Sequence, residues 1–473
     1  MDWIPCPCWG TYGDENVGEV ADRDPVLLVS GIGGSILHSM KNGSKSQIRV
    51  WVRIFLANLA FKQSVCLYLS FDQRERDDFQ LRLSLKSWTF RLPYELKKSY
   101  TEPLDENIEI VVPDDDHGLY AIDILDPSWF VKLFHLTEVY HFHDMIEMLV
   151  GCGYKKGTTL FGYGYDFRQS NRIDLLILGL KKKLETAYKC SGGRKITIIS
   201  HSMGGLMVSC FMYLHPEAFS KYVNKWITIA TPFQGAPGCI NDSLLTGVQF
   251  VEGLESFFFV SRWTMHQLLV ECPSIYEMMG NPDFKWKKQP EIRVWRKKKS
   301  ENDDDTSAEL ESFGLIESID LFNNALKNNE LSYGGNKIAL PFNFAILDWA
   351  ASTREILNKA QLPDGVSFYN IYGVSLDTPL DVCYGTETSP IEDLSEICQT
   401  MPEYTYVDGD GTVPAESAAA AQFKAVASVG VSGSHRGLLR DKRVFELIQQ
   451  WLGVESKKAK RKQLRTRKVV DSG

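Results

Sequence analysis

The chain has 473 residues, of which 44% are hydrophobic and 24% charged, and its formal net charge is −8. This composition supplies a large buried core, and its charged content is ordinary for a soluble globular protein. Residues 457–468 hold 8 of the positive charges, so the rest of the chain is more acidic still, which speaks against nucleic-acid binding.

The first 23 residues begin Met-Asp-Trp-Ile-Pro-Cys-Pro-Cys-Trp and contain no basic or long apolar segment. We therefore expect no secretory signal peptide here, and no membrane-spanning helix in the chain. Residues 1–23 are a candidate membrane-associating segment, in which Cys6 and Cys8 are acylated, belong to a disordered tip, or form a weak metal-ligand pair. The ten cysteines have no repeated spacing, which favours reduced thiols in the cytosol.

Residues 24–232 alternate between predicted strands and helices. Short continuous apolar runs, typical of strands buried in a parallel sheet, occupy residues 25–30, 195–199, 224–230 and 366–373. Helical periodicity is found at residues 171–188, 204–215 and 442–451. Ser170 or Asn171 is expected to cap the first of these helices. The alternation predicts an α/β fold with a doubly wound, mostly parallel sheet, built from residues 24–232 and 364–453.

Residues 233–363 lack a regular period, so we predict a cap inserted between two strands of the core. Within it, the Lys/Asp-rich residues 296–305 are expected to form a surface loop. Residues 50–63 are expected to be lid-like, and residues 64–100 fit neither helix nor strand and form an atypical insert. Residues 454–473 are expected to be a basic, disordered tail, with attraction to anionic lipid headgroups as the alternative.

Ser202 is the candidate nucleophile. It lies in Ser200-His-Ser-Met-Gly204, between a predicted strand and a predicted helix. A serine hydroxyl becomes nucleophilic when a base takes its proton, and α/β-hydrolases hold this serine on a tight strand-to-helix turn flanked by small residues. Gly204 meets this requirement, and Ser200 replaces the usual glycine on the other side. The pattern therefore predicts a serine esterase of the α/β-hydrolase fold.

The base and the acid should follow the nucleophile in the order serine, acid, histidine. Of the nine histidines, only His435 lies beyond the predicted cap, in a loop before the last helix. The acid is expected in the segment Asp408-Gly-Asp410-Gly, where we favour Asp410 and keep Asp408 as the alternative. The acid orients the imidazole and stabilises its charged form.

Two backbone N–H groups are candidates for an oxyanion hole, which stabilises the negative charge of a tetrahedral intermediate. One belongs to Met203, directly after the nucleophile. The other belongs to Ile32, in the glycine loop of residues 31–34 that follows the first strand. A purely structural glycine turn is the alternative for this loop.

Other motifs are explained better by structure than by chemistry. The segment His141-Phe142-His143-Asp144 has metal-like composition but no second ligand pair, so we expect a structural role and no metal. The segment 165–168 is expected to hold an internal ion pair or to cap the next helix. The apolar runs 244–251 and 257–263 either pack the cap against the sheet, which we favour, or contact lipid.

Several motifs together resemble the lecithin:cholesterol acyltransferase family. They occupy residues 29–36, 163–168, 200–205, 408–413 and 434–436. The opening of the chain and residues 49–53 resemble in particular the plant members that act as phospholipases A1. The likeness extends over residues 24–452 apart from 64–100, where this chain departs from those members.

The resemblance implies hydrolysis of the sn-1 acyl ester of glycerophospholipids such as phosphatidylcholine, giving a lysophospholipid and a fatty acid. It implies Ser202 as nucleophile, Asp410 as acid and His435 as base, with no cofactor. It also implies work at a phospholipid membrane surface, on the cytoplasmic side of microsomal or endoplasmic-reticulum membranes. Nothing in the sequence points to an obligate protein partner. Two other functions stay open: a transacylase that passes the acyl group to a sterol or lysolipid, and a non-catalytic lipid-binding protein.

Overall fold

The computed structural model describes most of the chain between residues 23 and 454. The described residues are 23–41, 43, 47–51, 90–91, 102–103, 108–128, 137–251, 262–299, 306–333 and 336–454. The predictions for the N-terminal segment, for most of the lid-like segment 50–63 and the insert 64–100, and for the basic tail lie outside these residues.

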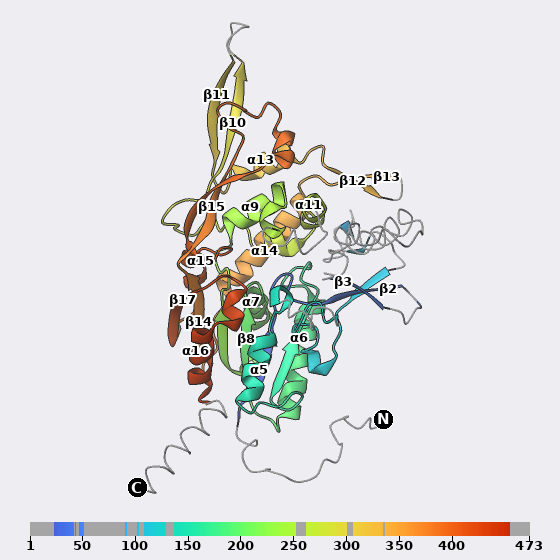
Figure 1. Ribbon diagram of the computed structural model, residues 1–473. Helices are drawn as coiled ribbons and strands as arrows, with labels where there is room; N and C mark the ends of the chain where they lie inside the picture. Colours follow the sequence, from blue (N-terminus) through green and yellow to red (C-terminus); the bar gives the residue numbers. More distant parts are fainter. Residues whose placement is uncertain are drawn as a thin grey trace, which may run out of the picture.

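Among the described residues, a parallel sheet of six strands forms the centre of the molecule (Figure 1). Its strands are β1 (Val26–Val29), β7 (Leu160–Tyr163), β8 (Ile196–His201), β9 (Val223–Ile229), β14 (Ser367–Val374) and β17 (Ala427–Ser432). They lie in the order β17-β14-β9-β8-β1-β7, and all neighbours are parallel. The strands β1, β7 and β8 are buried along their whole length, which is why their sequences are continuous apolar runs.

Helices cover both faces of this sheet. They are α5 (His143–Gly151), α6 (Asp174–Cys190), α7 (Gly204–Leu214), α8 (Pro216–Tyr222) and α16 (Lys442–Leu452). The helices α6 and α7 pack with one set of alternate strand residues, among them Leu27 and Ile198. The helices α5 and α16 pack with the other set, among them Leu28 and Ile199. Successive strand residues point to opposite faces of a sheet, so each apolar run supplies buried side chains to both layers of helices. The predicted doubly wound α/β-hydrolase fold is confirmed.

The start of α6 differs from the prediction. Neither Ser170 nor Asn171 caps the helix: Ile173 occupies the N-cap position, and its side chain makes no cap hydrogen bond. The Ser170 hydroxyl instead donates to the Glu277 carboxylate (2.5 Å), and the backbone and side-chain N–H groups of Asn171 donate to it at 2.8 and 2.7 Å. Both side chains therefore join the core to Glu277, which lies in the region predicted to be the cap.

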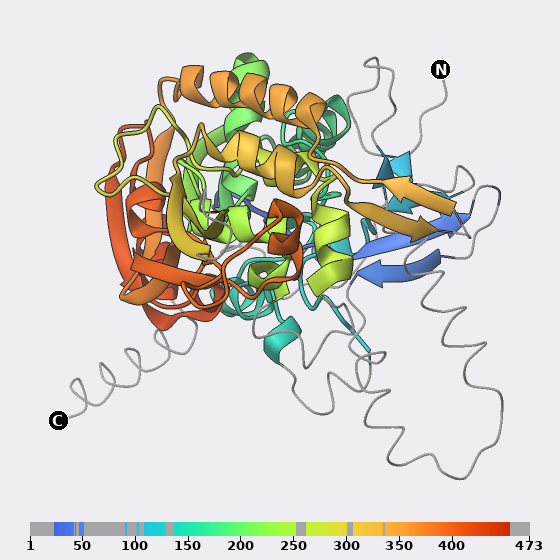
Figure 2. The ribbon, with the colours of Figure 1, turned by 90° about the horizontal axis from the view of Figure 1, so that it is seen from above.

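The residues between β9 and β14 lie over the core, as Figures 1 and 2 show from two directions. Their elements, apart from two strands treated next, are α9 (Pro237–Leu245), α10 (Val248–Val251), α11 (Arg262–Leu269), α12 (Pro273–Tyr276), α13 (Ser318–Ala325), α14 (Phe344–Lys359), β12 (Glu330–Tyr333) and β13 (Asn336–Ala339). Every residue of α9 is buried. Leu244 and Leu245 thus pack inside the protein, as favoured for this apolar run, whereas residues 257–261 of the other run lie outside the described part.

A second sheet joins the cap to a later part of the chain. Its strands are β10 (Ile292–Lys299), β11 (Thr306–Phe313), β15 (Leu376–Tyr384) and β16 (Glu403–Gly409), in the order β11-β10-β15-β16. The sequence assigned residues 376–409 to the core, but β15 pairs in parallel with β10, with Ile292 opposite Val382. This pairing connects segments far apart in the chain, so local periodicity did not reveal it.

The Lys/Asp-rich segment predicted as a loop is a strand up to Lys299, and residues 300–305 lie outside the described part. The strands β10 and β11 form an antiparallel ribbon that extends away from the core (Figure 1). Ion pairs join its strands: Arg296 with Glu311 at 3.9 Å, and Lys298 with Glu309. The charged side chains therefore lie on the solvated sides of a ribbon. A Lys/Asp-rich segment of sequence is compatible with such a ribbon and with a surface loop, so the sequence did not distinguish the two.

The remaining described elements are short. They are the antiparallel sheet of β2 (Leu37–Lys41), β3 (Gln47–Trp51) and β6 (Ile108–Val111), the pair β4 (Phe90–Arg91) and β5 (Glu102–Pro103), α15 (Ala415–Ala419), and the 3-10 helices η1 (Asp116–Gly118), η2 (Thr137–Val139), η3 (Leu394–Gln399) and η4 (Gly437–Arg440).

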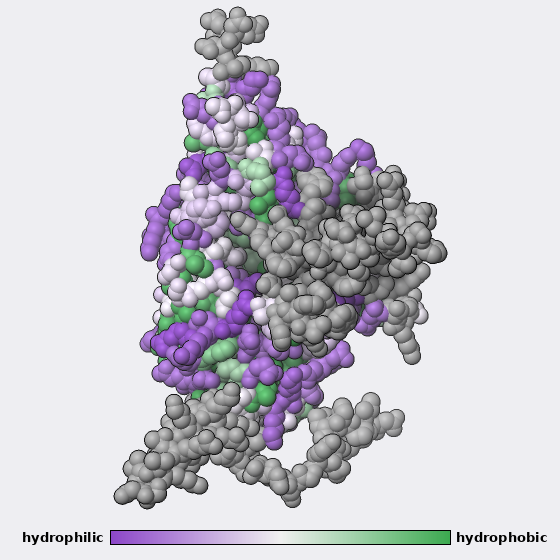
Figure 3. Space-filling model, in the orientation of Figure 1, coloured by the Kyte–Doolittle hydropathy of each residue, from purple (hydrophilic) through white to green (hydrophobic). Residues whose placement is uncertain are grey.

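No helix in the described ranges has the length and apolar character needed to cross a membrane. On the surface that Figure 3 shows, hydrophobic residues form small, separate areas among hydrophilic residues. Among the described cysteines, Cys152, Cys210, Cys272, Cys383 and Cys398 are free thiols.

Candidate active site

Ser202 lies on the sharp turn between β8 and α7. Its backbone φ is +54°, a left-handed conformation that costs a non-glycine residue about 1–2 kcal/mol. The turn is held because the Ser202 N–H donates to the carbonyl of Ile229 at 2.8 Å. Small neighbours are required here: a Cβ on Gly204 would come within 2.3 Å of the Ser30 carbonyl oxygen. The strained turn presents the hydroxyl at the carboxyl end of the sheet, as the sequence predicts.

Ser200, which stands where α/β-hydrolases usually have glycine, has a role of its own. Its side chain is fully buried, and its Oγ accepts a hydrogen bond from Nε1 of Trp226 at 2.9 Å. A buried indole N–H needs an acceptor, and the Ser200 hydroxyl supplies one. Glycine has no side chain that could do so, which gives the serine a role beyond its small size.

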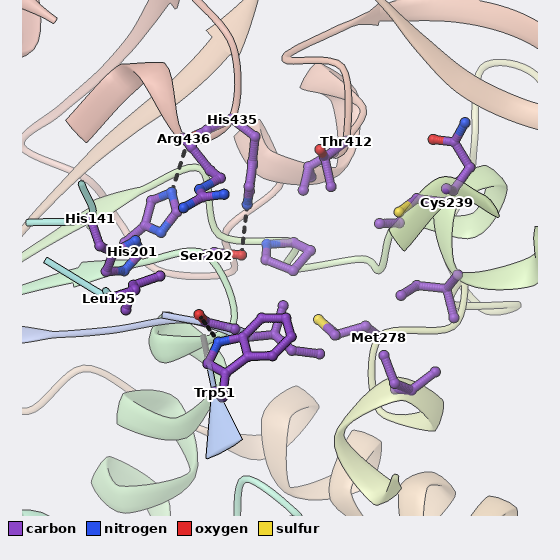
Figure 4. A pocket seen from close by; sticks show the side chains of 18 residues that line it. Trp51, Leu125, His141, His201, Ser202, Cys239, Met278, Thr412, His435 and Arg436 are labelled. Atoms are coloured by element: carbon purple, nitrogen blue, oxygen red, sulfur yellow. Dashed lines mark hydrogen bonds between the residues drawn. The ribbon is translucent and has the colours of Figure 1, made fainter. Parts of the chain in front are cut away.

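The structure brings Ser202, His435 and Asp410 together in one hydrogen-bonded chain. The Ser202 Oγ lies 2.8 Å from Nε2 of His435 (Figure 4), and Nδ1 of His435 lies 2.7 Å from Oδ2 of Asp410. The other carboxylate oxygen of Asp410 accepts from the N–H groups of Thr412 (3.0 Å) and Val413 (2.7 Å). Asp410 is buried, so these bonds fix the carboxylate in place and aim one oxygen at the imidazole.

Asp408, the alternative acid, lies elsewhere. Its side chain is exposed, and its Oδ1 accepts from the backbone N–H of Ser375. Asp410 also packs against the core: a Cβ on Gly373 would come 2.3 Å from the Cβ of Asp410. The geometry therefore favours Asp410 over Asp408 as the partner of the histidine.

The glycine loop after β1 passes directly over the nucleophile. A Cβ on Gly31 would come 2.7 Å from the Cβ of Ser202, and Ile32 lines the same cavity as Ser202. Nε1 of Trp51 donates to the carbonyl of Gly33 at 2.7 Å and holds the loop from the other side. Met203 occupies the N-cap position of α7, where backbone N–H groups have no partner within the helix. Both proposed oxyanion donors, Ile32 and Met203, thus lie beside Ser202.

Two further histidines lie beside the catalytic base: His201 packs against His435, with ring centroids 4.8 Å apart, and His141 packs against His201. The sequence reasoning did not relate either of them to the site. Nε2 of His201 lies 3.0 Å from the carbonyl oxygen of His435 and donates to it, which positions the backbone of the base. The rings of His201 and His141 lie 5.4 Å apart. Burial above all lowers the pKa of both well below the usual value, and the neighbouring charges of His435 and Arg436 act in the same direction. Both rings are therefore neutral at pH 7 and do not compete for the proton that His435 handles.

The remaining motifs have structural roles. His143 pairs with Asp123 at 2.7 Å, and no group of three or more metal-ligating side chains gathers within the described ranges. The buried Arg168 pairs with Asp166 at 2.6 Å, which is the internal ion pair foreseen for residues 165–168.

A cavity of about 270 Å³ lies in front of Ser202. Beside Ser202 and His435, its walls come from the core (Ile32, Trp51, Leu125) and from the cap (Ala236, Cys239, Ile240, Ile275, Met278). These walls are mainly apolar and suit an acyl chain. The arrangement supplies a nucleophile, a base oriented by an acid, and backbone N–H donors. These are the groups that nucleophilic attack on an acyl carbonyl requires.

Known proteins resemble the chain over most of its length. The family model for lecithin:cholesterol acyltransferase matches residues 97–424. The chain is 87% identical to phospholipase A(1) LCAT3 of Arabidopsis thaliana over 473 residues, covering 100% of each chain. It is 49% identical to lecithin-cholesterol acyltransferase-like 4 of the same plant over 432 residues, covering 91% of this chain and 76% of the other.

More distant relatives match less of the chain. Human lysosomal phospholipase A and acyltransferase is 29% identical over 147 residues, which is 31% of this chain and 34% of the other. Among solved structures, the one described as the crystal structure of the Tle4-Tli4 complex aligns with a TM-score of 0.49 at 15% identity, covering 90% of this chain and 96% of that one. The chain belongs to the lecithin:cholesterol acyltransferase family.

Proposed function

We propose that the protein is a phospholipase A1, which hydrolyses the sn-1 acyl ester of glycerophospholipids such as phosphatidylcholine to a lysophospholipid and a free fatty acid. The observation that carries the proposal is the hydrogen-bonded chain of Ser202, His435 and Asp410 at the wall of an apolar cavity. The choice of substrate is supported by the relative named phospholipase A(1), which is 87% identical over the whole chain.

In the first half of the reaction, the Ser202 Oγ attacks the ester carbonyl carbon while Nε2 of His435 takes the hydroxyl proton. The carbonyl oxygen becomes negatively charged and receives hydrogen bonds from the N–H groups of Met203 and Ile32. Asp410 stabilises the imidazolium. When the intermediate collapses, the bond to the glycerol oxygen breaks, and His435 gives its proton to that oxygen, so the lysophospholipid leaves.

In the second half, water resolves the acyl-enzyme. His435 takes a proton from the water as its oxygen attacks the acyl carbonyl, and the same two N–H groups stabilise the new oxyanion. Collapse breaks the bond to the Ser202 Oγ, which recovers a proton from His435, and the fatty acid leaves. The site returns to its starting state without a cofactor taking part in any step.

The test of this proposal is the variant Ser202→Ala, with the exposed Ser432→Ala as a matched control. Release of fatty acid from phosphatidylcholine should fall on the order of 10⁴-fold or more in Ser202→Ala, because no other group forms the acyl-enzyme. A fluorophosphonate should label the wild type and Ser432→Ala but not Ser202→Ala. Wild-type rates in Ser202→Ala would refute the assignment, and absent labelling of folded wild type would favour a non-catalytic lipid-binding protein.

A transacylase is the second candidate, and it shares the first half-reaction. The relatives named phospholipase A and acyltransferase support it, as do the apolar cavity walls, which limit the access of water to an acyl-enzyme. Assays with labelled sterol and labelled lysolipid as acceptors separate the two functions. Transfer to either acceptor in preference to fatty-acid release would make the protein a transacylase.

We also propose that the protein acts while bound peripherally to a phospholipid membrane, on the cytoplasmic side of the endoplasmic reticulum. The Lys/Arg-rich residues 457–468 support this, because each such residue near an anionic surface contributes about 1 kcal/mol of attraction. Deletion of residues 457–473 should weaken co-sedimentation with anionic vesicles, and a tagged full chain should fractionate with microsomes. Binding that is independent of both the tail and lipid charge would contradict the role of the tail.

A further inference from the structure

We propose that Arg436 binds the phosphate of the phospholipid headgroup and so sets the preference for phospholipids over neutral lipids. The inference rests on the proposed function and concerns the same site. Arg436 follows His435 directly in the chain, and it lines the same cavity as the Ser202 hydroxyl.

The guanidinium of Arg436 lacks a partner among the residues that the structure describes. It is partly buried, yet its side chain makes no hydrogen bond or ion pair with any described residue. Burial lowers the pKa of Arg436, and the like charge of Arg440 lowers it further, but a guanidinium stays protonated in proteins. A cation withdrawn from water without a counter-ion is unfavourable, so an anion entering the cavity would be bound there.

The groups around Arg436 leave this charge uncompensated. His141 and His201 both feel the positive charge of Arg436, which lowers their pKa in addition to the effect of burial. They are neutral rings and offer no negative charge. The carboxylate of Asp410 is already engaged by His435 and by two backbone N–H groups. No described residue therefore supplies the counter-charge, and the phosphate of the ligand is the anion that we assign to it.

The cavity has two chemically different ends on either side of the nucleophile. Figure 4 shows Arg436, His141 and His201 on one side of the pair formed by Ser202 and His435, and Cys239 and Met278 on the other. An ester carbonyl held at Ser202 would place its acyl chain among the apolar groups and its glycerol toward Arg436. In a glycerophospholipid the phosphate lies only a few bonds beyond that glycerol, and a planar guanidinium binds phosphate oxygens through paired hydrogen bonds.

The experiment compares phosphatidylcholine with a diacylglycerol that carries the same acyl chains, in the same detergent micelles. The ratio of the two kcat/KM values should fall about ten- to hundredfold in Arg436→Gln, mainly through KM, because one charge-assisted pair with the phosphate is lost. Arg436→Lys should recover part of the ratio, since it keeps the charge but not the paired geometry. The control is Arg440→Gln, because Arg440 is exposed and donates to the Thr137 carbonyl, outside the cavity.

Each result is decisive. If Arg436 bound the carboxylate of the released fatty acid instead of the phosphate, Arg436→Gln would affect both substrates alike, because both release the same fatty acid. An unchanged ratio of the two kcat/KM values would therefore overturn the proposal. An equal loss on both substrates would reduce Arg436 to a structural role. Glycerophosphocholine should inhibit diacylglycerol hydrolysis by the wild type more strongly than by Arg436→Gln, and equal inhibition would also overturn the proposal. Failure of the proposed function looks different, because wild type and Ser202→Ala would then release fatty acid at the same rate.

Discussion

Asp410 and Asp408 are two residues apart in the chain, yet only Asp410 contacts His435. Asp410→Asn should lower kcat by about 10⁴-fold, because an amide no longer holds the imidazole in the required tautomer or stabilises its charge. Asp408→Asn removes only an exposed acceptor for the Ser375 N–H and should leave kcat within about threefold of wild type. Steady-state kinetics of both variants checks this, and a larger loss in Asp408→Asn than in Asp410→Asn would reverse the assignment.

At this scale, the sequence located Ser202, His435 and Asp410 because each occupies a place that the fold's chain order prescribes. It left Asp408 open, since an Asp-Gly-Asp segment contains no information about which carboxylate faces inward. It also missed the contact of His201 with His435 and the position of Arg436 in the cavity. His201 meets the backbone of His435 across 234 residues, and no local pattern announces such a contact.

Among the elements, the junction between the cap and the core depends on one buried carboxylate. Glu277, directly after α12, accepts from Ser170, Asn171 and Thr353. Its charge also raises the pKa of Arg354, whereas burial, the larger effect, lowers that pKa to about 10. Glu277 therefore holds donors from the loop before α6 and from α14 at one point, where cap and core meet.

Glu277→Ala should lower the free energy of unfolding by about 3–5 kcal/mol, because it leaves several buried donors without their acceptor and the buried Arg354 without a neighbouring negative charge. The control is Glu355→Ala on α14, whose exposed pair with Lys359 at 3.2 Å should contribute less than about 1 kcal/mol. Urea unfolding followed by tryptophan fluorescence measures both values. Equal effects of the two substitutions would show that Glu277 does not hold the junction together.

The elements of the core were predictable and the pairing of the cap was not, for a physical reason. A strand buried on both faces must be apolar throughout, and a helix covering a sheet must repeat its apolar side chains every three or four residues. Both signals are local, and β1, β8, β9, α6, α7 and α16 appeared where they were expected. The strands β10 and β15 pair with each other although β14 lies between them in the chain. Their sequences alone did not reveal this pairing, so part of β10 was predicted as a loop and β15 as a segment of the core.

Considered as a whole, cap and core share one apolar interior. Buried core residues such as Leu27 and Phe368 belong to the same cluster as Ile292, Phe342 and Tyr384 from the cap and the second sheet. We therefore expect one cooperative unfolding transition rather than separate transitions for cap and core. Urea unfolding monitored by far-ultraviolet circular dichroism and by tryptophan fluorescence should give coincident midpoints. Two resolved transitions would show that the cap folds as an independent domain.

The position of Asp410 directly after β16 links catalysis to the seating of the second sheet. This strand pairs with β15, and β15 with β10 of the cap, while the carboxylate itself lies against Gly373 at the end of β14. A displacement that carried β15 and β16 away from the core would draw the carboxylate off His435 and leave the base without orientation. A lipid that enters by displacing the sheet would find the serine unactivated until the sheet returns.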